Sequence, residues 1–177
     1  MIVTFVCTAN ICRSAYAEVT ARHRLAEAGA AGVSVFSAGT WGLTGRPMCP
    51  EMAVEAERRG ASTASFRASR LDRELVDRSD LLLTAEAAHR QFLLDDWPRA
   101  VRRVATLRQF ARTLAGADPG LSLADLVADT RVGRASRADT DVTDPFGRGP
   151  AAAAACAAEL DALLDVIVPR LAGLALH

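Results

Sequence analysis

The chain lacks the features that mark several large classes of protein. Its 177 residues carry 21 basic and 21 acidic side chains, histidine aside, so the formal net charge is zero. A balanced chain offers no broad basic surface to nucleic acid or to an anionic membrane. We therefore expect no nucleic-acid partner, and any positive field for a ligand has to be local.

Long uninterrupted hydrophobic runs are also missing. The apolar stretch between residues 151 and 176 contains four charged side chains, which argues against insertion into a membrane. These are Glu159, Asp161, Asp165 and Arg170. The short apolar run at the amino terminus has no basic start, so we expect no signal peptide. The expected location is cytoplasmic and reducing.

Cysteine is scarce, and its spacing argues against two common uses. The four cysteines are Cys7, Cys12, Cys49 and Cys156. No Cys-x2-Cys pair with a nearby histidine is present, so we expect no metal site and no cofactor. A disulfide scaffold does not suit a reducing location. Cys12 is open to two interpretations: a reversible disulfide with Cys7 that protects it from over-oxidation, or a packed thiol.

What the chain does have is a cysteine loop directly after an apolar run. Residues 7–14 read Cys-Thr-Ala-Asn-Ile-Cys-Arg-Ser and follow the apolar residues 2–6. A helix that opens here points free N–H groups and partial positive charge into the loop, which suits a bound phosphate. Arg13 adds a planar two-pronged donor, and the same field favours the thiolate form of Cys7.

These features make Cys7 a candidate nucleophile for covalent phosphoryl transfer. Asn10 would hold the shape of the loop, and Ser14 would donate to the sulfur or cap the helix. The alternative is a buried thiol packed at a strand end, because a Cys-x5-Arg spacing alone also arises by chance. The candidate phosphate-binding residues are Thr8, Ala9, Asn10, Ile11, Cys12 and Ser14.

A second half-site is predicted near the other end of the chain. Cleavage of a phosphate ester needs a proton for the leaving oxygen, and the carboxylic acid of Asp144 can supply it. Pro145 stiffens the loop and keeps Asp144 out of helical backbone angles. Asp139 and Asp141 are nearby rivals, but neither precedes a proline. The alternative for the Asp-Pro pair is an ordinary surface turn.

The pattern of apolar runs and breakers predicts an α/β fold. Strands are expected at residues 2–6, 33–36, 81–84 and 101–107. Helices are expected at residues 14–28, 50–59, 71–78, 87–94, 109–114 and 121–127, and from 150, where Pro169 should kink or end the last one. This alternation indicates one domain over residues 1–177, with a four-stranded parallel sheet and helices on both faces. An inserted or mobile segment is expected at about 115–140.

The cysteine loop resembles the active-site loop of the low-molecular-weight protein tyrosine phosphatases. The motifs at residues 37–40 (Ser-Ala-Gly-Thr), 79–86 and 144–145 also resemble landmarks of that family, in the family's order. The resemblance implies that Cys7 is the nucleophile, Arg13 the phosphate clamp and Asp144 the general acid. Three positions depart from the family: Ala9 replaces a usual glycine, Ala15 a frequent proline, and Phe66 a bracing histidine found in some members.

Two aromatic side chains could hold the ring of an aryl phosphate. Trp41 and Phe146 are the candidates for the walls of such a slot, although Trp41 could equally anchor its own loop. The three histidines show no catalytic pattern, and we expect His89 to be solvated or half buried on its helix. Tyr16 is expected to pack beneath the loop.

The combined interpretation is a protein-tyrosine-phosphatase that works through a cysteinyl phosphate, without metal or cofactor. Its expected substrate is a phosphotyrosine protein or a small aryl phosphate, and the oligomeric state is left open. A phosphoarginine phosphatase is the alternative within the family, although its members tend to carry threonine where Ile11 stands. Arsenate reductases need further cysteines downstream, and residues 71–101 contain none. A phosphate-binding module without turnover is the alternative from another class.

Overall fold

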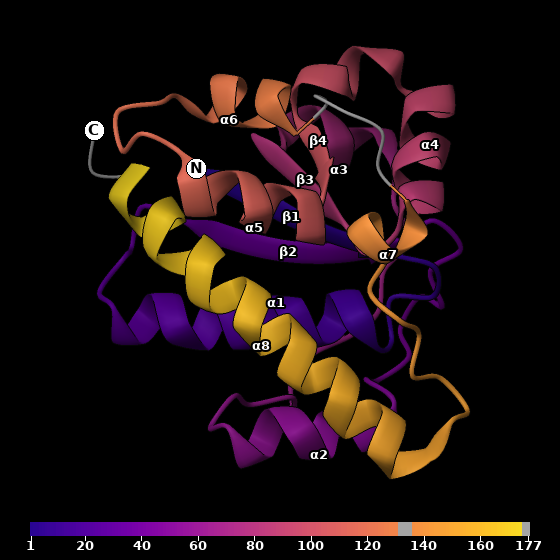
Figure 1. Cartoon of the computed structure of the whole chain (residues 1–177). Coiled ribbons are helices and arrows are strands. Elements are labelled where there is room, and N and C mark those ends of the chain that lie inside the picture. The colour runs from indigo at the N-terminus through magenta and orange to yellow at the C-terminus, as the bar shows by residue number, and fades with distance from the viewer. Residues whose placement is uncertain (131–135, 175–177) are drawn as a thin grey trace.

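A four-stranded parallel sheet forms the centre of the molecule (Figure 1). The structure is a computed structural model, and it describes residues 1–130 and 136–174. The strand order is β2-β1-β3-β4, and all three neighbouring pairs are parallel. The strands are β1 (Ile2–Cys7), β2 (Ser34–Gly39), β3 (Leu81–Thr84) and β4 (Val104–Thr106).

Alternating residues of β1 face two different cores. Val3 and Phe5 lie in the larger core, which also contains buried residues of α1, α5 and α8. Val6 lies in the smaller core on the other face, which contains buried residues of α3 and α4. Successive side chains of a strand point to opposite faces, so a strand covered on both sides is apolar throughout. The predicted α/β class, with helices on both faces of the sheet, is confirmed.

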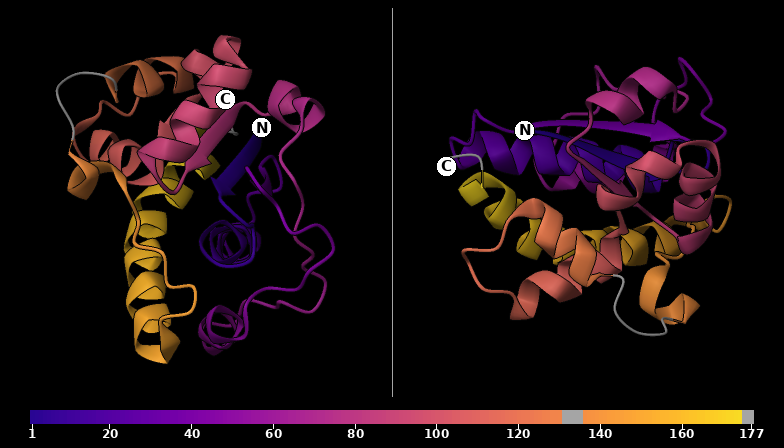
Figure 2. Two further views of the ribbon diagram at one scale, coloured as in Figure 1. Left: turned by 90° about the vertical axis from the view of Figure 1, so that its right-hand side faces the viewer. Right: turned by 90° about the horizontal axis from the view of Figure 1, so that it is seen from above.

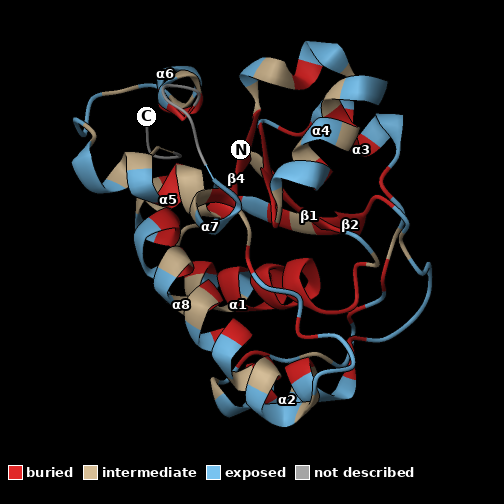
Figure 3. Cartoon of the chain, turned by 45° about the vertical axis from the view of Figure 1, so that its right-hand side comes forward, coloured by how far each residue is buried: buried red, intermediate tan, exposed pale blue. Residues whose placement is uncertain are grey.

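The helices form unequal layers. The larger layer contains α1 (Arg13–Glu27), α5 (Leu107–Gly116), α6 (Leu123–Asp129) and α8 (Gly149–Leu174), with α2 (Pro50–Arg58) packed on α1 and α8. The smaller layer contains α3 (Arg73–Arg78), α4 (Ala87–Asp96) and the 3-10 helix η1 (Pro98–Arg102). Viewed end-on in Figure 2, α1 lies between the strands and the helices α2 and α8. Figure 3 shows how much of α1 is buried as a result.

The structure differs from the expected elements in three places. The fourth strand is only three residues long. The 3-10 helix that starts at Pro98 continues to Arg102 and so covers the first residues of the expected strand at 101–107. Pro169 does not end the last helix, which continues to Leu174. In the segment at 115–140 the helix expected at 121–127 is present as α6, which buries Leu126 and Val127 in the larger core, whereas the short helix α7 (Arg137–Thr140) was not expected. Residues 131–135 of that segment lie outside the described residues.

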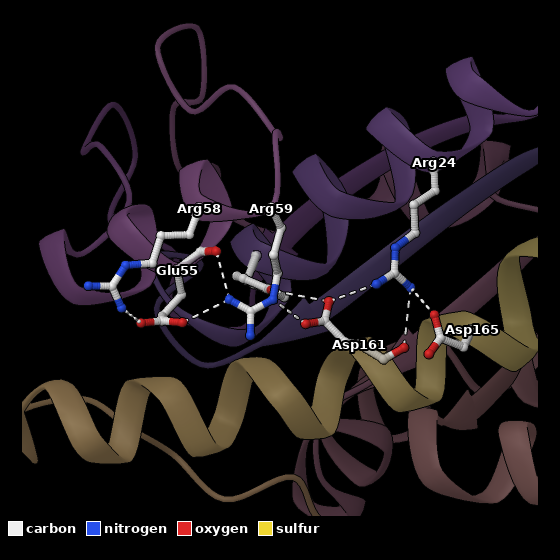
Figure 4. A network of polar contacts seen from close by, with 7 residues as sticks. Arg24, Glu55, Arg58, Arg59, Asp161 and Asp165 are labelled. Atoms are coloured by element: carbon white, nitrogen blue, oxygen red, sulfur yellow. Dashed lines mark hydrogen bonds and ion pairs between the residues drawn. The ribbon is translucent and has the colours of Figure 1, made fainter.

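An ion-pair network joins α1, α2 and α8 below the sheet (Figure 4). The carboxylate of Asp161 on α8 pairs with Arg59 after α2 and, at 2.9 Å, with Arg24 on α1. The hydroxyl of Tyr16 donates to the same carboxylate at 3.0 Å. Asp161 and Tyr16 are largely or fully buried, so this carboxylate fixes the position of α1, the helix that begins at the cysteine loop.

Candidate active site

The cysteine loop connects the carboxyl end of β1 to the first turn of α1. Cys7 is the last residue of β1 and is buried, and α1 begins at Arg13. Asn10 has a φ of 57°, in the left-handed region that asparagine tolerates better than most residues. That angle turns the loop back on itself. The backbone N–H groups of residues 8–12 consequently have no acceptor within the part of the chain that the structure describes.

A hydrogen-bond network determines the environment of the Cys7 sulfur. The Asn10 side-chain oxygen accepts from the Ser69 N–H at 2.7 Å, so its amide nitrogen has to face the other way. That nitrogen donates to the hydroxyls of Ser14 at 2.9 Å and Ser37 at 2.7 Å. The Ser14 oxygen accepts from Asn10, which leaves the Ser14 proton available for donation, and the Cys7 sulfur lies 2.9 Å from that oxygen. A hydroxyl that donates to sulfur stabilises the thiolate.

Neighbouring glycines let a second loop pack against the first. A side-chain carbon added at Gly39 would come within 2.4 Å of the Thr8 carbonyl oxygen. Backbone N–H groups of Thr40 and Trp41 donate to the carbonyls of Cys7 and Thr8, both at 2.9 Å. The cysteine loop is therefore held from the β2 side by main-chain contacts.

Arg13 is almost fully buried, with 2% of its side chain exposed, and its contacts engage both terminal nitrogens. One terminal nitrogen pairs with Glu86 and donates to the Val142 carbonyl at 3.0 Å, and the other pairs with Asp144 at 3.0 Å. Burial disfavours the charge, but Glu86 and the negative groups of Cys7 and Asp144 outweigh it and raise the pKa of Arg13. The Nε atom has no partner among the described residues.

The free donors together form an anion cradle around the sulfur. A buried N–H group without an acceptor destabilises the protein. A bound phosphate would accept hydrogen bonds from the Arg13 Nε and the loop N–H groups and so remove that penalty. The amino end of α1 adds positive charge at the same point. The geometry therefore suits a tetrahedral dianion placed over Cys7.

Asp144 reaches this cradle from the segment before α8. The Val142 N–H donates to the carbonyl of Ala85 at 2.8 Å, which pins the segment beside the end of β3. Asp144 is half exposed, with 47% of its side chain accessible, and one of its oxygens accepts from the Phe146 N–H at 3.2 Å. The carboxylate thus lies at the cradle and in contact with solvent, as a proton donor needs.

The rival carboxylates have structural partners instead. Asp139 pairs with Arg112 at 3.0 Å and accepts from Ser136 in the capping box of α7. Asp141 accepts from the Ala87 N–H at 2.8 Å, at the start of α4. Neither lines the cavity at Cys7.

A cavity of about 190 Å³ opens above the loop. Its lining residues are Cys7, Thr8, Ala9, Ile11, Cys12, Arg13, Leu43, Asp144 and Phe146. Trp41 is not among them: it is 62% exposed, stacks under the Arg70 guanidinium and contacts Phe92. Leu43 supplies the wall that we expected from Trp41, and its N–H donates to the carbonyl of Ala9 in the cysteine loop at 3.0 Å.

His89 is a residue of the site that sequence reasoning missed. It is buried rather than solvated, and its Nε2 atom makes a 2.8 Å hydrogen bond with the Thr8 hydroxyl. Burial lowers the pKa of His89, and the positive charge of Arg13 adds to that effect against the carboxylate of Glu86. The available signal was its position one helical turn after Glu86, since such residues share a helix face.

The described residues contain no cluster of three or more histidine, cysteine or acidic side chains that could hold a metal ion. None of the helices in the described ranges has the length and apolar character needed to cross a membrane. A larger hollow of about 530 Å³ lies between α1 and β2, and Arg22 is the one ionisable residue that lines it.

A parallel α/β domain with a thiol in an anion-binding loop at a strand end is the kind of scaffold that carries covalent phosphoryl transfer. The model of the low molecular weight phosphotyrosine protein phosphatases matches residues 2–122, and the chain belongs to this family. The match includes the cysteine loop and Glu86 but ends before Asp144, so it does not address the role of that carboxylate.

Individual relatives include two kinds of phosphatase. The probable low molecular weight protein-tyrosine-phosphatase EpsP of Ralstonia nicotianae is 35% identical over 108 residues, which are 59% of this chain and 71% of the relative. The solved YwlE arginine phosphatase from Geobacillus stearothermophilus is 26% identical with a TM-score of 0.76, over 96% of this chain and 92% of its own. The solved low molecular weight protein tyrosine phosphatase from T. tengcongensis is 26% identical with a TM-score of 0.75. That match covers 96% of this chain and 98% of the solved one.

Proposed function

We propose that this chain removes phosphate from tyrosine in proteins through a phosphocysteine intermediate at Cys7. The observation that carries the proposal is the set of free donors around that sulfur: the Arg13 Nε and the loop N–H groups of residues 8–12. An oxidation-sensitive thiol nucleophile works best in a reducing compartment, which supports a cytoplasmic site of action.

The first step transfers the phosphoryl group to sulfur. The Cys7 thiolate attacks phosphorus in line as the bond from phosphorus to the tyrosine oxygen breaks. Asp144 gives its proton to that oxygen, and tyrosine leaves in its neutral form. Arg13 and the loop N–H groups hold the equatorial oxygens, where charge is greatest in the transition state.

The second step returns the enzyme to its starting state. Asp144, now a carboxylate, takes a proton from water as the water oxygen attacks phosphorus and the sulfur–phosphorus bond breaks. The products are inorganic phosphate and the Cys7 thiolate. Ser14 donates to the sulfur in both steps, which makes Cys7 a better leaving group.

The cavity walls favour an aromatic ester over phosphoarginine. Ile11, Leu43 and Phe146 present apolar surface on which a phenyl ring can lie, and Asp144 is the one carboxylate among the lining residues. A phosphoarginine side chain carries N–H groups, for which these apolar walls offer no acceptor and Asp144 is the one carboxylate within the cavity. Phosphoarginine remains the second candidate because the similarity to the arginine phosphatase from Geobacillus stearothermophilus spans almost the whole chain.

The test compares wild type, Cys7→Ser and Cys156→Ala with a phosphotyrosine peptide and a phosphoarginine peptide. Wild type and Cys156→Ala should hydrolyse phosphotyrosine faster and be inhibited by vanadate. Cys7→Ser should bind inorganic phosphate without turnover. Preference for phosphoarginine would replace the proposed substrate by the second candidate. Phosphate binding by wild type without hydrolysis of either peptide would make the chain a binding module, and normal turnover by Cys7→Ser would overturn the mechanism.

A further inference from the structure

Two buried thiols lie side by side behind the phosphate loop. Cys12 belongs to the loop, and Cys49 is the residue that precedes the first turn of α2. The Cys49 N–H donates to the carbonyl of Ile11 at 2.8 Å, so the backbone of Cys49 is bonded to the residue that precedes Cys12. Their side chains interact directly, and both are buried in the larger core.

The contact between the two thiols shifts their pKa values in opposite directions. Interaction with Cys49 raises the pKa of Cys12, and burial raises it further. The contact from Cys12 lowers the pKa of Cys49, and the Met52 N–H in the first turn of α2 contributes in the same direction, against burial. Cys49 is therefore the thiol of the pair that loses its proton more readily, and the thiolate is the form that attacks a disulfide.

Cys156 is a third buried thiol of the same core, and it does not line the cavity at Cys7. Burial raises the pKa of Cys156 to about 12, which keeps it protonated. It lies on α8 and is as buried as Cys12. Cys156 is therefore a buried control cysteine outside the cavity.

We propose that Cys49 is a resolving thiol: oxidation at the phosphate loop ends as a disulfide between Cys12 and Cys49, and Cys7 is returned to its reduced form. The inference takes from the proposed function only that Cys7 is the reactive sulfur. Its basis is that Cys12 contacts Cys49 and lines the cavity together with Cys7.

The chemistry balances with hydrogen peroxide as the oxidant. The Cys7 thiolate attacks peroxide, the O–O bond breaks, and sulfenic acid and hydroxide form. That hydroxide takes the Cys12 proton as Cys12 attacks the sulfenic sulfur, a second hydroxide leaves, and a Cys7–Cys12 disulfide forms. The second hydroxide removes the Cys49 proton, and Cys49 then attacks the Cys12 sulfur and expels the Cys7 thiolate.

The last exchange is favoured by the leaving group. Ser14 and the positive end of α1 stabilise the thiolate of Cys7, and a stabilised thiolate leaves a disulfide faster. Cys49 needs little movement, because its backbone is already bonded to the loop. The oxidised enzyme would keep Cys7 as a thiolate, and the two-electron oxidation would be stored in the Cys12–Cys49 disulfide.

The experiment oxidises reduced enzyme with one equivalent of hydrogen peroxide, maps disulfides by mass spectrometry without reduction, and follows phosphatase activity with no reductant added. Wild type and Cys156→Ala should accumulate Cys12–Cys49 and recover activity. Cys49→Ser should accumulate Cys7–Cys12 and recover at least about tenfold less activity. Cys7→Ser should form Cys12–Cys49 much more slowly, because the first sulfur to react is gone.

Three outcomes would overturn the inference: a Cys7–Cys12 disulfide as the stable product in wild type, a Cys49 thiol that remains free for alkylation, or equal recovery by Cys49→Ser. Serine is a good residue before the first turn of a helix, so this variant should fold. If it does not, the disulfide map of wild type decides alone. Absence of phosphatase activity in the fully reduced enzyme would instead count against the proposed function, since the disulfide map does not depend on turnover.

Discussion

Replacing Asp144 with asparagine should move two measured quantities in opposite directions. In the proposed mechanism the carboxylic acid of Asp144 donates a proton to the leaving oxygen, and the amide of asparagine cannot act as that acid. The same carboxylate pairs with Arg13 at 3.0 Å in the ligand-free protein, and there it competes with an incoming phosphate. The substitution should therefore slow chemistry and strengthen phosphate binding.

The magnitudes follow from the exposure of the pair. Loss of a general acid typically slows a reaction by about 10²–10⁴. Asp144 is 47% exposed, so its ion pair is worth only about 0.2–1 kcal/mol. Removing it should tighten phosphate binding by up to about fivefold, since 1.4 kcal/mol corresponds to about tenfold.

The assay pairs stopped-flow measurement of the first phosphoryl transfer with calorimetric titration of inorganic phosphate. Asp139→Asn is the matched control, because it removes the same charge from a carboxylate bound to Arg112 and Ser136. With a more acidic phenol as leaving group, the defect of Asp144→Asn should shrink. Weaker phosphate binding by Asp144→Asn, or a rate defect equal to that of Asp139→Asn, would refute the assignment.

Three further predictions concern single side chains. Burial holds the pKa of His89 below its ordinary value of about 6.5, so the unfolded chain takes up a proton that the folded chain refuses. The contribution of the neutral His89 to the free energy of unfolding should be fully present above about pH 6.5 and should be lost as the pH falls below it. Urea titrations at several pH values measure this decrease, and His89→Gln should make it smaller. Asp161→Ala should lower the free energy of unfolding by about 3 kcal/mol, against less than about 1 kcal/mol for the exposed Asp165→Ala. Leu43→Ala should raise KM for an aryl phosphate by about fivefold, whereas Trp41→Ala should leave it within about twofold.

The elements and candidate residues that could be predicted from the sequence are those that their immediate neighbours in the sequence identify. Strands of a covered parallel sheet are apolar throughout, so β1 and β3 stand out as short hydrophobic runs. The cysteine loop carries its sulfur, its arginine and its helix start within eight positions. Asp144 was distinguishable from Asp139 because a proline follows it.

The missed residues reach the site by tertiary contact alone. Leu43 lines the cavity because its backbone is hydrogen-bonded to Ala9 of the cysteine loop, and nothing in its local sequence distinguishes it from the more conspicuous Trp41. His89 lies below Thr8 because β1 and β3 are hydrogen-bonded neighbours, and that pairing is not visible in the sequence. Cys49 meets Cys12 only after α2 has packed on α1 and α8.

The contacts of Arg13 show how the site combines a rigid loop with an acid that has to move. Glu86 and the Val142 carbonyl hold one guanidinium nitrogen from the β3 side, so the orientation of Arg13 does not depend on a ligand. Asp144 is two residues beyond Val142 and holds the other nitrogen. An incoming phosphate can displace that carboxylate without releasing Val142, and the acid then stays within reach of the leaving oxygen. We therefore interpret the ion pair in the free protein as a resting position for Asp144, and the short tether to Val142 suits the two steps proposed for this carboxylate.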